Sequence, residues 1–338
     1  MTDFKQVLVT GGAGYVGSVL VPRLLERGYR VRVLDLYLYG DHVLDALRDN
    51  PHLEQIHGDI RNLAHLRRSV KGCDAVIHLA CISNDPSFDL DPELGRSINF
   101  LAFEPLVRLS KSAGVRRFVY ASSSSVYGVS EVPDVAEEHP LAPLTDYSKY
   151  KAQCEPILLE RQSAGFTPVV IRPATVCGYS PRQRLDLTVN ILTNLAVNTG
   201  RITVFGGNQM RPNIHIDDMV DLYLLLLQVP DRSIAGQVFN AGYQNHTVAE
   251  LAGAVQEVVQ AEMPGREKVE IVTTPTDDHR SYHISSERIR RVLAFSPRRT
   301  IRDAIGDLVS AFKAGKLPDS LTDIRYFNLK TMQARKLK

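Results

Sequence analysis

Tyr147 and Lys151 are the residues whose types and spacing most directly suggest chemistry. They lie four positions apart in the sequence DYSKYK, so a helix would place both side chains on one face. The ammonium group would then favour the ionised phenol and lower the pKa of Tyr147. Such a phenol can take a proton from a hydroxyl group while a hydride leaves the same carbon. Tyr150 does not repeat the pattern, because the residue four positions on is Cys154.

A serine-rich turn precedes this pair in the sequence ASSSSVYG, residues Ala121–Gly128. The turn directly follows an apolar stretch that reads as a strand. Side chains at the carboxyl end of such a strand point into the crevice where open α/β sheets bind ligands. We therefore expect Ser123 to hydrogen-bond the reacting oxygen. A serine-rich turn without a catalytic role is the alternative when the motif is taken alone.

A third group of residues could hold a dinucleotide. Gly11, Gly14 and Gly17 are three residues apart in QVLVTGGAGYVGS, between an apolar strand and an amphipathic helix. This pattern allows a tight turn, close approach of a pyrophosphate, and binding of its charge at the helix N-terminus. Asp35 ends the next strand, where its carboxylate can accept hydrogen bonds from the adenosine ribose. It would repel a 2′-phosphate and no arginine follows it directly, so NAD is favoured over NADP.

The elements that must position these residues alternate along the first half of the chain. Strands alternating with helices at this spacing predict βαβ units and a parallel sheet. The expected strands are Gln6–Thr10, Arg30–Asp35, Leu53–His57, Ala75–Leu79, Arg117–Ser122 and Thr167–Arg172. The expected helices are Tyr15–Arg27, Leu63–Val70, Pro92–Ala113 and Asp146–Ser163.

The pattern after Pro173 is less regular and predicts a smaller lobe. Strands are expected at Ile202–Phe205 and Val238–Ala241, and helices at Asp217–Gln228, Thr247–Ala261, Ser285–Leu293 and Ile301–Phe312. The fold class is therefore α/β, a Rossmann-like doubly wound parallel sheet with a smaller C-terminal α/β substrate lobe. The expected division is a dinucleotide-binding domain over 1–175, to which 213–242 returns, a lobe over 176–212 and 243–330, and a solvated basic tail over 331–338.

Composition narrows the classes of function. The 338 residues are 44% hydrophobic, enough for a sizeable core, and the formal net charge is +2. This charge indicates neither nucleic acid nor an anionic membrane as a partner, and no apolar stretch is long enough for a bilayer span. The cysteines Cys73, Cys81, Cys154 and Cys177 form no CxxC pair, and the histidines form no metal motif. We expect a cytoplasmic protein with reduced thiols and no metal site.

Taken in order, these motifs resemble extended short-chain dehydrogenases/reductases of the NAD-dependent epimerase/dehydratase family. The resemblance covers nearly the whole chain. The matching segments are TGGAGYVGS, GDIR (Gly58–Arg61), HLA (His78–Ala80), SSSSVYG, YSKYK, RPATVCGYSPR (Arg172–Arg182), RPNIHIDD (Arg211–Asp218), FNAG (Phe239–Gly242) and DDHRSYHIS (Asp277–Ser285).

The resemblance implies NAD in the first domain, a nucleotide sugar in the lobe, and a homodimer built on the helices near Pro92–Ala113 and Asp146–Ser163. Asn99 matches an asparagine that braces the active-site loops, and Tyr147, Lys151 and Ser123 match the catalytic group. The implied cofactor-binding residues are Gly11, Gly14, Tyr15, Val16, Gly17, Asp35, Asp59, Ile60, Leu79, Ala80, Lys151 and Pro173. The implied substrate-binding residues are Ser83, Asn84, Ser124, Thr175, Arg184, Asn190, Arg211 and Arg280, of which the last two suit a diphosphate.

Departures from the family pattern narrow the reaction. The 4,6-dehydratases carry Asp-Glu after the catalytic hydroxyl residue, and sugar-acid decarboxylases often have a glutamate at the second position. Here these positions are Ser124 and Ser125, a form more similar to 4-epimerases. Thr175 replaces an asparagine found in many members. ACISNDPSF (Ala80–Phe88) and SPRQRLDLTVN (Ser180–Asn190) resemble a subgroup that includes enzymes oxidising C4 of GDP-heptose.

The leading hypothesis is therefore a nucleotide-sugar epimerase that oxidises C4 reversibly through a 4-keto intermediate. A dehydrogenase, oxidase or ketoreductase that stops after one hydride transfer is the second hypothesis. A non-catalytic NAD-binding sensor or scaffold is a third, from another class of function, and the intact Tyr147/Lys151 pair argues against it.

Overall fold

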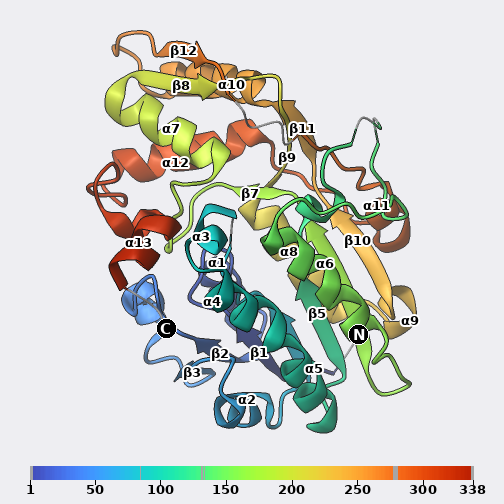
Figure 1. Cartoon of the computed structure of the whole chain (residues 1–338). Helices are drawn as coiled ribbons and strands as arrows, with labels where there is room; N and C mark the ends of the chain where they lie inside the picture. The colour runs from blue at the N-terminus through green and yellow to red at the C-terminus, as the bar shows by residue number, and fades with distance from the viewer. Residues whose placement is uncertain (1–2, 84, 131, 133, 277–280, 336–338) are drawn as a thin grey trace.

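A computed structural model describes residues 3–335 except 84, 131, 133 and 277–280. Within these residues, the fold is built around a seven-stranded parallel sheet with strand order β10-β6-β5-β4-β1-β2-β3 (Figure 1). The strands are β1 (Gln6–Thr10), β2 (Arg30–Asp35), β3 (Leu53–His57), β4 (Ala75–His78), β5 (Arg117–Ala121), β6 (Thr167–Pro173) and β10 (Gln237–Ala241). The predicted α/β, Rossmann-like class is confirmed.

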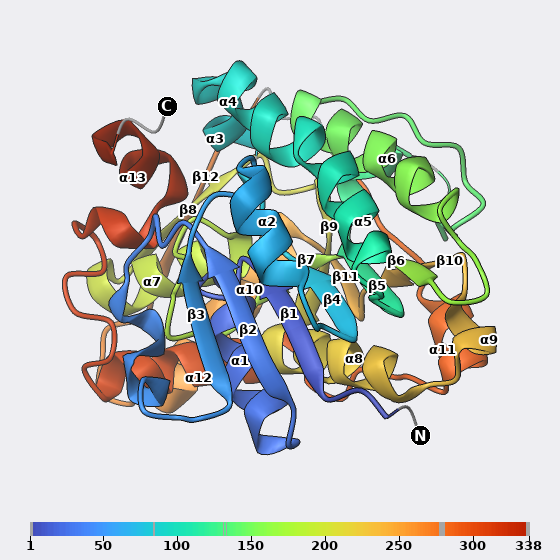
Figure 2. The same cartoon turned by 90° about the horizontal axis from the view of Figure 1, so that it is seen from below.

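Helices cover both faces of this sheet because successive strand residues point to opposite sides. Val7 and Val9 of β1 are buried in one apolar core, and Leu8 between them is buried in the other. The first core is covered by α1 (Gly17–Glu26) and α8 (Ile216–Gln228). The opposite core is covered by α2 (Leu63–Val70), α5 (Phe103–Ser112) and α6 (Asp146–Leu159), which lie on one side of the sheet in Figure 2.

The helix expected over Pro92–Ala113 is interrupted. The structure has α4 (Pro92–Arg96), then a wide π-helical turn over Ser97–Leu101, then α5. The Ala102 N–H bonds the Ser97 carbonyl, five residues back, at 3.1 Å. Pro105 explains the change, because it has no N–H for the carbonyl four residues before it and its ring crowds that carbonyl. The wider turn contains Asn99, whose side chain bonds the Ile82 backbone after β4.

Helix α6 begins as expected but ends earlier. Thr145 and Ser148 form a reciprocal capping box at its start, in which each side chain bonds the backbone of the other. The helix ends at Leu159 rather than at the expected Ser163. Ser163 and Phe166 exchange backbone hydrogen bonds of 3.1 and 3.0 Å, so the chain has already turned back toward β6.

A smaller lobe packs at the carboxyl end of the large sheet. Its helices α7, α10 and α12 contact one another, and α7 and α10 cover the parallel pair β8–β12. A three-stranded sheet, β11-β9-β7, lies between this lobe and the large sheet. The bounds are β7 (Thr175–Cys177), α7 (Thr188–Thr199), β8 (Arg201–Phe205), β9 (Met210–His215), β11 (Gln244–Thr247), α10 (Val248–Glu262), β12 (Glu270–Thr274) and α12 (Ile301–Lys313).

The segment expected to return to the first domain is divided between two sheets. Asn213–His215 belong to β9, whereas α8 packs on α1 and β10 pairs with β6. The remaining short helices are α3 (Asp85–Leu90), α9 (Asp231–Ile234), α11 (Glu287–Leu293) and α13 (Asn328–Arg335). No described helix has the length and apolar character that a membrane span requires.

The prediction of a solvated tail beginning at residue 331 was wrong. Residues 331–335 belong to α13, which packs against α3. Asn328, Thr331 and Met332 are at most 3% exposed, and Met332 belongs to the apolar core that α2, α5 and α6 cover. Residues 336–338 lie outside the described part of the chain. The last helix is therefore part of the folded molecule.

Candidate active site

A cavity of about 370 Å³ lies at the carboxyl end of the parallel sheet, where open α/β sheets bind ligands. Residues after β1, β2, β4, β5 and β6 line it, together with α6 and the segment that leads into the lobe. The predicted site residues along its wall are Gly11, Gly14, Tyr15, Val16, Gly17, Asp35, Ile60, Leu79, Ala80, Ser83, Ser123, Ser124, Tyr147, Lys151, Pro173, Thr175 and Arg184. Residues from distant parts of the sequence therefore share one space.

The glycine-rich loop at the floor of this cavity admits no side chains at two positions. Gly11 has φ = +77°, and a Cβ there would lie 2.6 Å from the Ala80 backbone nitrogen. A Cβ on Gly17 would lie 2.4 Å from the Gly11 carbonyl oxygen. These close approaches bring the N-terminus of α1 to the cavity wall, where its free N–H groups favour phosphate. The loop thus fits a dinucleotide.

Asp35 is held in the orientation that a ribose-binding carboxylate needs. It accepts hydrogen bonds from the backbone N–H groups of Ala13 at 2.9 Å and Tyr37 at 2.8 Å. Burial raises its pKa, and these two hydrogen bonds oppose the rise. The Asp59 carboxylate is paired with Arg61 at 2.6 Å, and its neighbours Gly58 and Ile60 line the cavity.

The tyrosine and lysine of α6 lie on one wall of the cavity, but their electrostatics differ from the expectation. The Lys151 Nζ donates to the Ala121 carbonyl at 2.7 Å and lies 5.9 Å from the centre of the Tyr147 ring. Burial raises the pKa of Tyr147 well above its usual value; Arg184 and a hydrogen bond with Ser123 oppose this rise. The predicted lowering of this pKa was therefore wrong for the free protein, because desolvation outweighs the nearby charges.

The serine turn rests on a buried polar network. Ser122 donates to Glu155 at 2.6 Å, and Glu155 is paired with Arg172 at 2.6 Å. Arg172 also donates to the Tyr127 hydroxyl at 2.7 Å, and Tyr127 donates to Asn240 at 2.7 Å. This network joins β5, α6, β6 and β10 beneath Ser123. It was not predicted, because no local spacing relates these residues.

Asn99 lies in the π-helical turn and braces the chain after β4. Its Oδ1 accepts from the Ile82 N–H at 2.8 Å, and its Nδ2 donates to the Ile82 carbonyl at 2.9 Å. The neighbouring residues Cys81 and Ser83 line the cavity.

Asn99→Leu should leave both buried Ile82 groups unpaired and lower the free energy of unfolding by about 2–3 kcal/mol. Urea unfolding followed by circular dichroism would measure this. Ser110→Ala is a matched control on α5, since its buried hydroxyl has no partner in the described chain. The free energy of unfolding of this control should change by less than about 0.5 kcal/mol, as is usual for a substitution that removes no interaction. Equal stability of Asn99→Leu and wild type would contradict the bracing role.

A second cavity, of about 270 Å³, adjoins the first. Both are lined by Asp85, Ser125, Thr175, Leu187 and Tyr282, and the second also contains Arg211. The predicted substrate residues Ser124, Thr175 and Arg211 therefore lie along one continuous space. Asn84 and Arg280 lie outside the described residues.

Arg184 and Asn190 have different environments, although both were predicted to bind substrate. The Arg184 Nε bonds Asp186 at 2.9 Å, and its buried Nη2 has no partner among the described residues. Arg184 also lines the cavity. Asn190 is fully buried and bonds Tyr15, the Gly178 N–H and the Arg184 carbonyl. The Asn190 prediction is corrected, since its amide is used to position the loop rather than to meet a ligand.

Several cavity residues were missed by sequence reasoning. Arg182, Tyr39 and Asn328 line the first cavity, and Tyr282 lines both. Arg182 ends the segment Arg172–Arg182, which resembles the family pattern. Nothing in the sequence indicated which of the two arginines in this segment enters the cavity. Tyr39 and Asn328 had no local signal.

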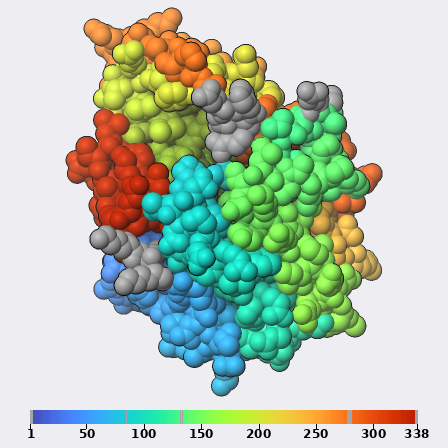
Figure 3. Space-filling view, in the orientation of Figure 1, coloured from blue at the N-terminus to red at the C-terminus, as the bar shows by residue number. Residues whose placement is uncertain are grey.

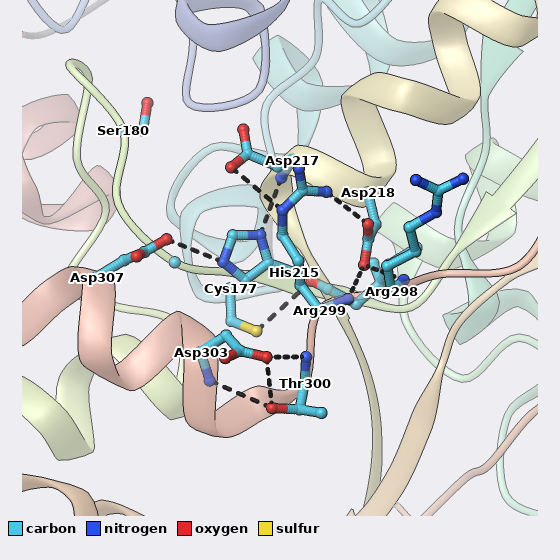
Figure 4. A network of polar contacts seen from close by, with 12 residues as sticks. Cys177, Ser180, His215, Asp217, Asp218, Arg298, Arg299, Thr300, Asp303 and Asp307 are labelled. Atoms are coloured by element: carbon cyan, nitrogen blue, oxygen red, sulfur yellow. Dashed lines mark hydrogen bonds and ion pairs between the residues drawn. The ribbon is translucent and has the colours of Figure 1, made fainter.

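The described residues contain a group of possible metal ligands, His215, Asp217 and Asp307, whose ligand atoms lie within 4.8 Å of one another. His215 Nδ1 accepts the Asp217 N–H at 3.1 Å as the cap of α8, so the ring proton belongs on Nε2. Nε2 faces Asp307 at 3.1 Å, as Figure 4 shows. Arg299 also lies beside Asp217. The imidazole has no lone pair left for a metal, and the group joins α8 to α12.

Comparison with known proteins adds to this geometry. A sequence model of the NAD dependent epimerase/dehydratase family matches residues 7–242. A dTDP-glucose 4,6-dehydratase from Streptomyces griseus is 31% identical over 90% of this chain and 93% of its own length. A UDP-glucose 4-epimerase from Mycolicibacterium smegmatis is 31% identical over 91% and 98%. The structure of DesIV, a dTDP-glucose 4,6-dehydratase from Streptomyces venezuelae with NAD bound, is similar with a TM-score of 0.81 and 25% identity, covering 92% and 98%. Both reaction types therefore occur among the relatives.

Proposed function

The chain belongs to the NAD-dependent epimerase/dehydratase family, and on this premise we propose that it is an NAD-dependent nucleotide-sugar 4-epimerase. One observation carries the proposal. The cavity that contains Tyr147, Lys151 and Ser123 also contains the glycine-rich loop and Asp35. A dinucleotide and a sugar hydroxyl can therefore meet at Tyr147. The adjoining cavity with Arg211 offers space and a cation for the nucleotide diphosphate.

Each catalytic side chain has a distinct task. Tyr147 takes the proton of the C4 hydroxyl and returns it when the 4-keto sugar is reduced. Ser123, which lines the same cavity as Tyr147, bonds the same substrate oxygen. The positive charge of Arg184 lowers the pKa of Tyr147 and so opposes the rise that burial causes. Bound NAD would supply the hydride acceptor and donor at C4.

The serines beside Ser123 separate this proposal from dehydration. Ser124 and Ser125 line the cavity at the positions where family 4,6-dehydratases carry Asp-Glu. A serine hydroxyl cannot exchange a proton readily near neutral pH, so these residues do not supply the acid and base that removal of water from C5 and C6 needs. This supports an epimerase although dehydratases are among the relatives.

The homodimer stays a prediction.

The proposal predicts that the purified protein with NAD inverts C4 of a nucleotide sugar without net NADH. A panel of UDP-, GDP-, CDP- and dTDP-linked hexoses and GDP-heptose would be followed by proton NMR and by NADH absorbance. Accumulation of NADH together with a keto product would show that the protein is a one-way dehydrogenase and not an epimerase. A 4-keto-6-deoxy product would contradict the argument from Ser124 and Ser125. Bound NAD without turnover of any sugar would favour a sensor or scaffold.

A further inference from the structure

An arginine from the segment leading into the lobe crosses the glycine-rich loop. Ser180 donates to the Tyr15 carbonyl at 2.7 Å, and the Arg182 N–H bonds the Ser18 hydroxyl at 3.3 Å. These contacts hold the segment on the first turn of α1. The Arg182 side chain then extends to Tyr39, four residues after Asp35, where its guanidinium lies 3.8 Å from the ring centre. It therefore reaches the end of the cavity where Asp35 lies.

Donor groups at this end of the cavity lack acceptors. Arg182 is only 4% exposed, and its Nε and Nη1 have no hydrogen-bond partner within the described part of the chain. The buried Tyr39 hydroxyl is likewise without a described partner. Burial lowers the pKa of Arg182 to about 10, so the guanidinium stays charged at neutral pH. Buried donors are normally satisfied, and a cation requires an acceptor-rich partner. The pattern points to a ligand with phosphate or hydroxyl oxygens.

We propose that Arg182 and Tyr39 donate hydrogen bonds to the ADP half of the dinucleotide, and that Asn328 of the last helix holds the guanidinium in place. The ADP half is the occupant because the glycine-rich loop and Asp35 form the remaining walls at this end. The second cavity, which contains Arg211, is not lined by Arg182. This inference rests on the proposed binding of NAD and adds Arg182, which is 147 positions beyond Asp35 in the sequence, to that site.

Asn328 fixes Arg182 from the opposite side. Its Oδ1 accepts from Arg182 Nη2, its Nδ2 donates to the Ser83 hydroxyl at 2.9 Å, and its backbone N–H donates to Asp186 at 2.9 Å. Asn328 is itself 1% exposed. Figure 3 shows the C-terminal residues in red beside the cyan surface near α3, and α13 contacts α3. The last helix therefore connects three segments of the cavity wall.

The test measures nucleotide binding directly, by isothermal titration of nucleotide-free protein with ADP and with NAD. Arg182→Met should raise the dissociation constants for both by roughly 10- to 100-fold, the loss expected for hydrogen bonds to a charged group. Tyr39→Phe removes only the hydroxyl, and Asn328→Ala removes only the anchor. Each should weaken binding by roughly 3- to 10-fold, since each affects about one hydrogen bond. Arg325→Met, an exposed arginine paired with Asp323 near the same helix, should bind as wild type does.

The outcomes separate this inference from the proposed function. Failure of the wild-type protein to bind either ADP or NAD would contradict the proposed cofactor site as a whole. Normal wild-type binding with unchanged affinity in folded Arg182→Met would overturn the Arg182 assignment alone. Circular dichroism and thermal unfolding establish whether that variant folds. If Arg182→Met does not fold, the Tyr39→Phe and Asn328→Ala variants test the proposal. Weaker nucleotide binding in both variants supports the site, and wild-type affinity in both overturns it.

Discussion

Tyr147→Phe is expected to lower kcat for nucleotide-sugar turnover by roughly 10²- to 10⁴-fold, the usual contribution of a positioned acid–base group. The substitution removes one hydroxyl from a partly buried ring and leaves its packing intact. Nothing in the cofactor-binding wall changes, so NAD should bind with wild-type affinity. The measurement is the initial rate at saturating sugar and NAD, together with isothermal titration of NAD.

Tyr150→Phe is the matched control for this substitution. Tyr150 lies on the same helix three residues on, but its ring packs between Phe88 and Phe100 with centroid distances of 5.7 and 5.3 Å. Its loss of a hydroxyl should change kcat by no more than about twofold, a value typical of substitutions away from the reacting groups. Wild-type turnover in Tyr147→Phe would remove Tyr147 from the mechanism. Loss of turnover accompanied by loss of NAD binding would assign it to the cofactor instead.

The second large effect is expected from the buried pair of Arg172 and Glu155. Both side chains are at most 6% exposed, and Arg172 contacts Glu155 through Nε at 3.0 Å and Nη2 at 2.6 Å. Although burial acts to lower the pKa of Arg172, Glu155 raises it above its usual value. Arg172→Met leaves the Glu155 carboxylate buried without its counter-charge. The free energy of unfolding should fall by about 3–5 kcal/mol, as measured by urea unfolding.

Two controls show that burial is the cause. The double variant Arg172→Met/Glu155→Leu should recover much of the lost stability, because no unpaired buried charge remains. Arg290 and Glu287 form an equally close pair at 2.7 Å, but both side chains are about 60% exposed. Arg290→Met should therefore cost less than about 1 kcal/mol. An Arg172→Met variant as stable as wild type would show that the buried pair does not support the fold beneath Ser123.

Much of the fold could be predicted because its signals are local. Apolar strands followed by amphipathic helices determined the parallel sheet, and the expected strands over the first half agree with the structure to within one residue at each end. The glycine spacing determined the loop after β1, since only glycine fits at Gly11 and Gly17. The four-residue spacing of Tyr147 and Lys151 placed both on one turn of α6. Helix α10 starts within one residue of the expected Thr247, because Thr247 and Glu250 form a capping box there.

Only the tertiary structure decided which distant residues meet and how strongly burial acts on them. Arg182 and Asn328 reach the same cavity as Asp35 and Ser83, although no local pattern relates them. Asn190 was expected at a ligand, but packing encloses it in protein. The pKa of Tyr147 rises because desolvation depends on everything that surrounds the ring, not on the lysine four residues away. Sequence spacing determines which groups share a helix or strand, whereas proximity across the fold and removal from water arise only when the elements pack.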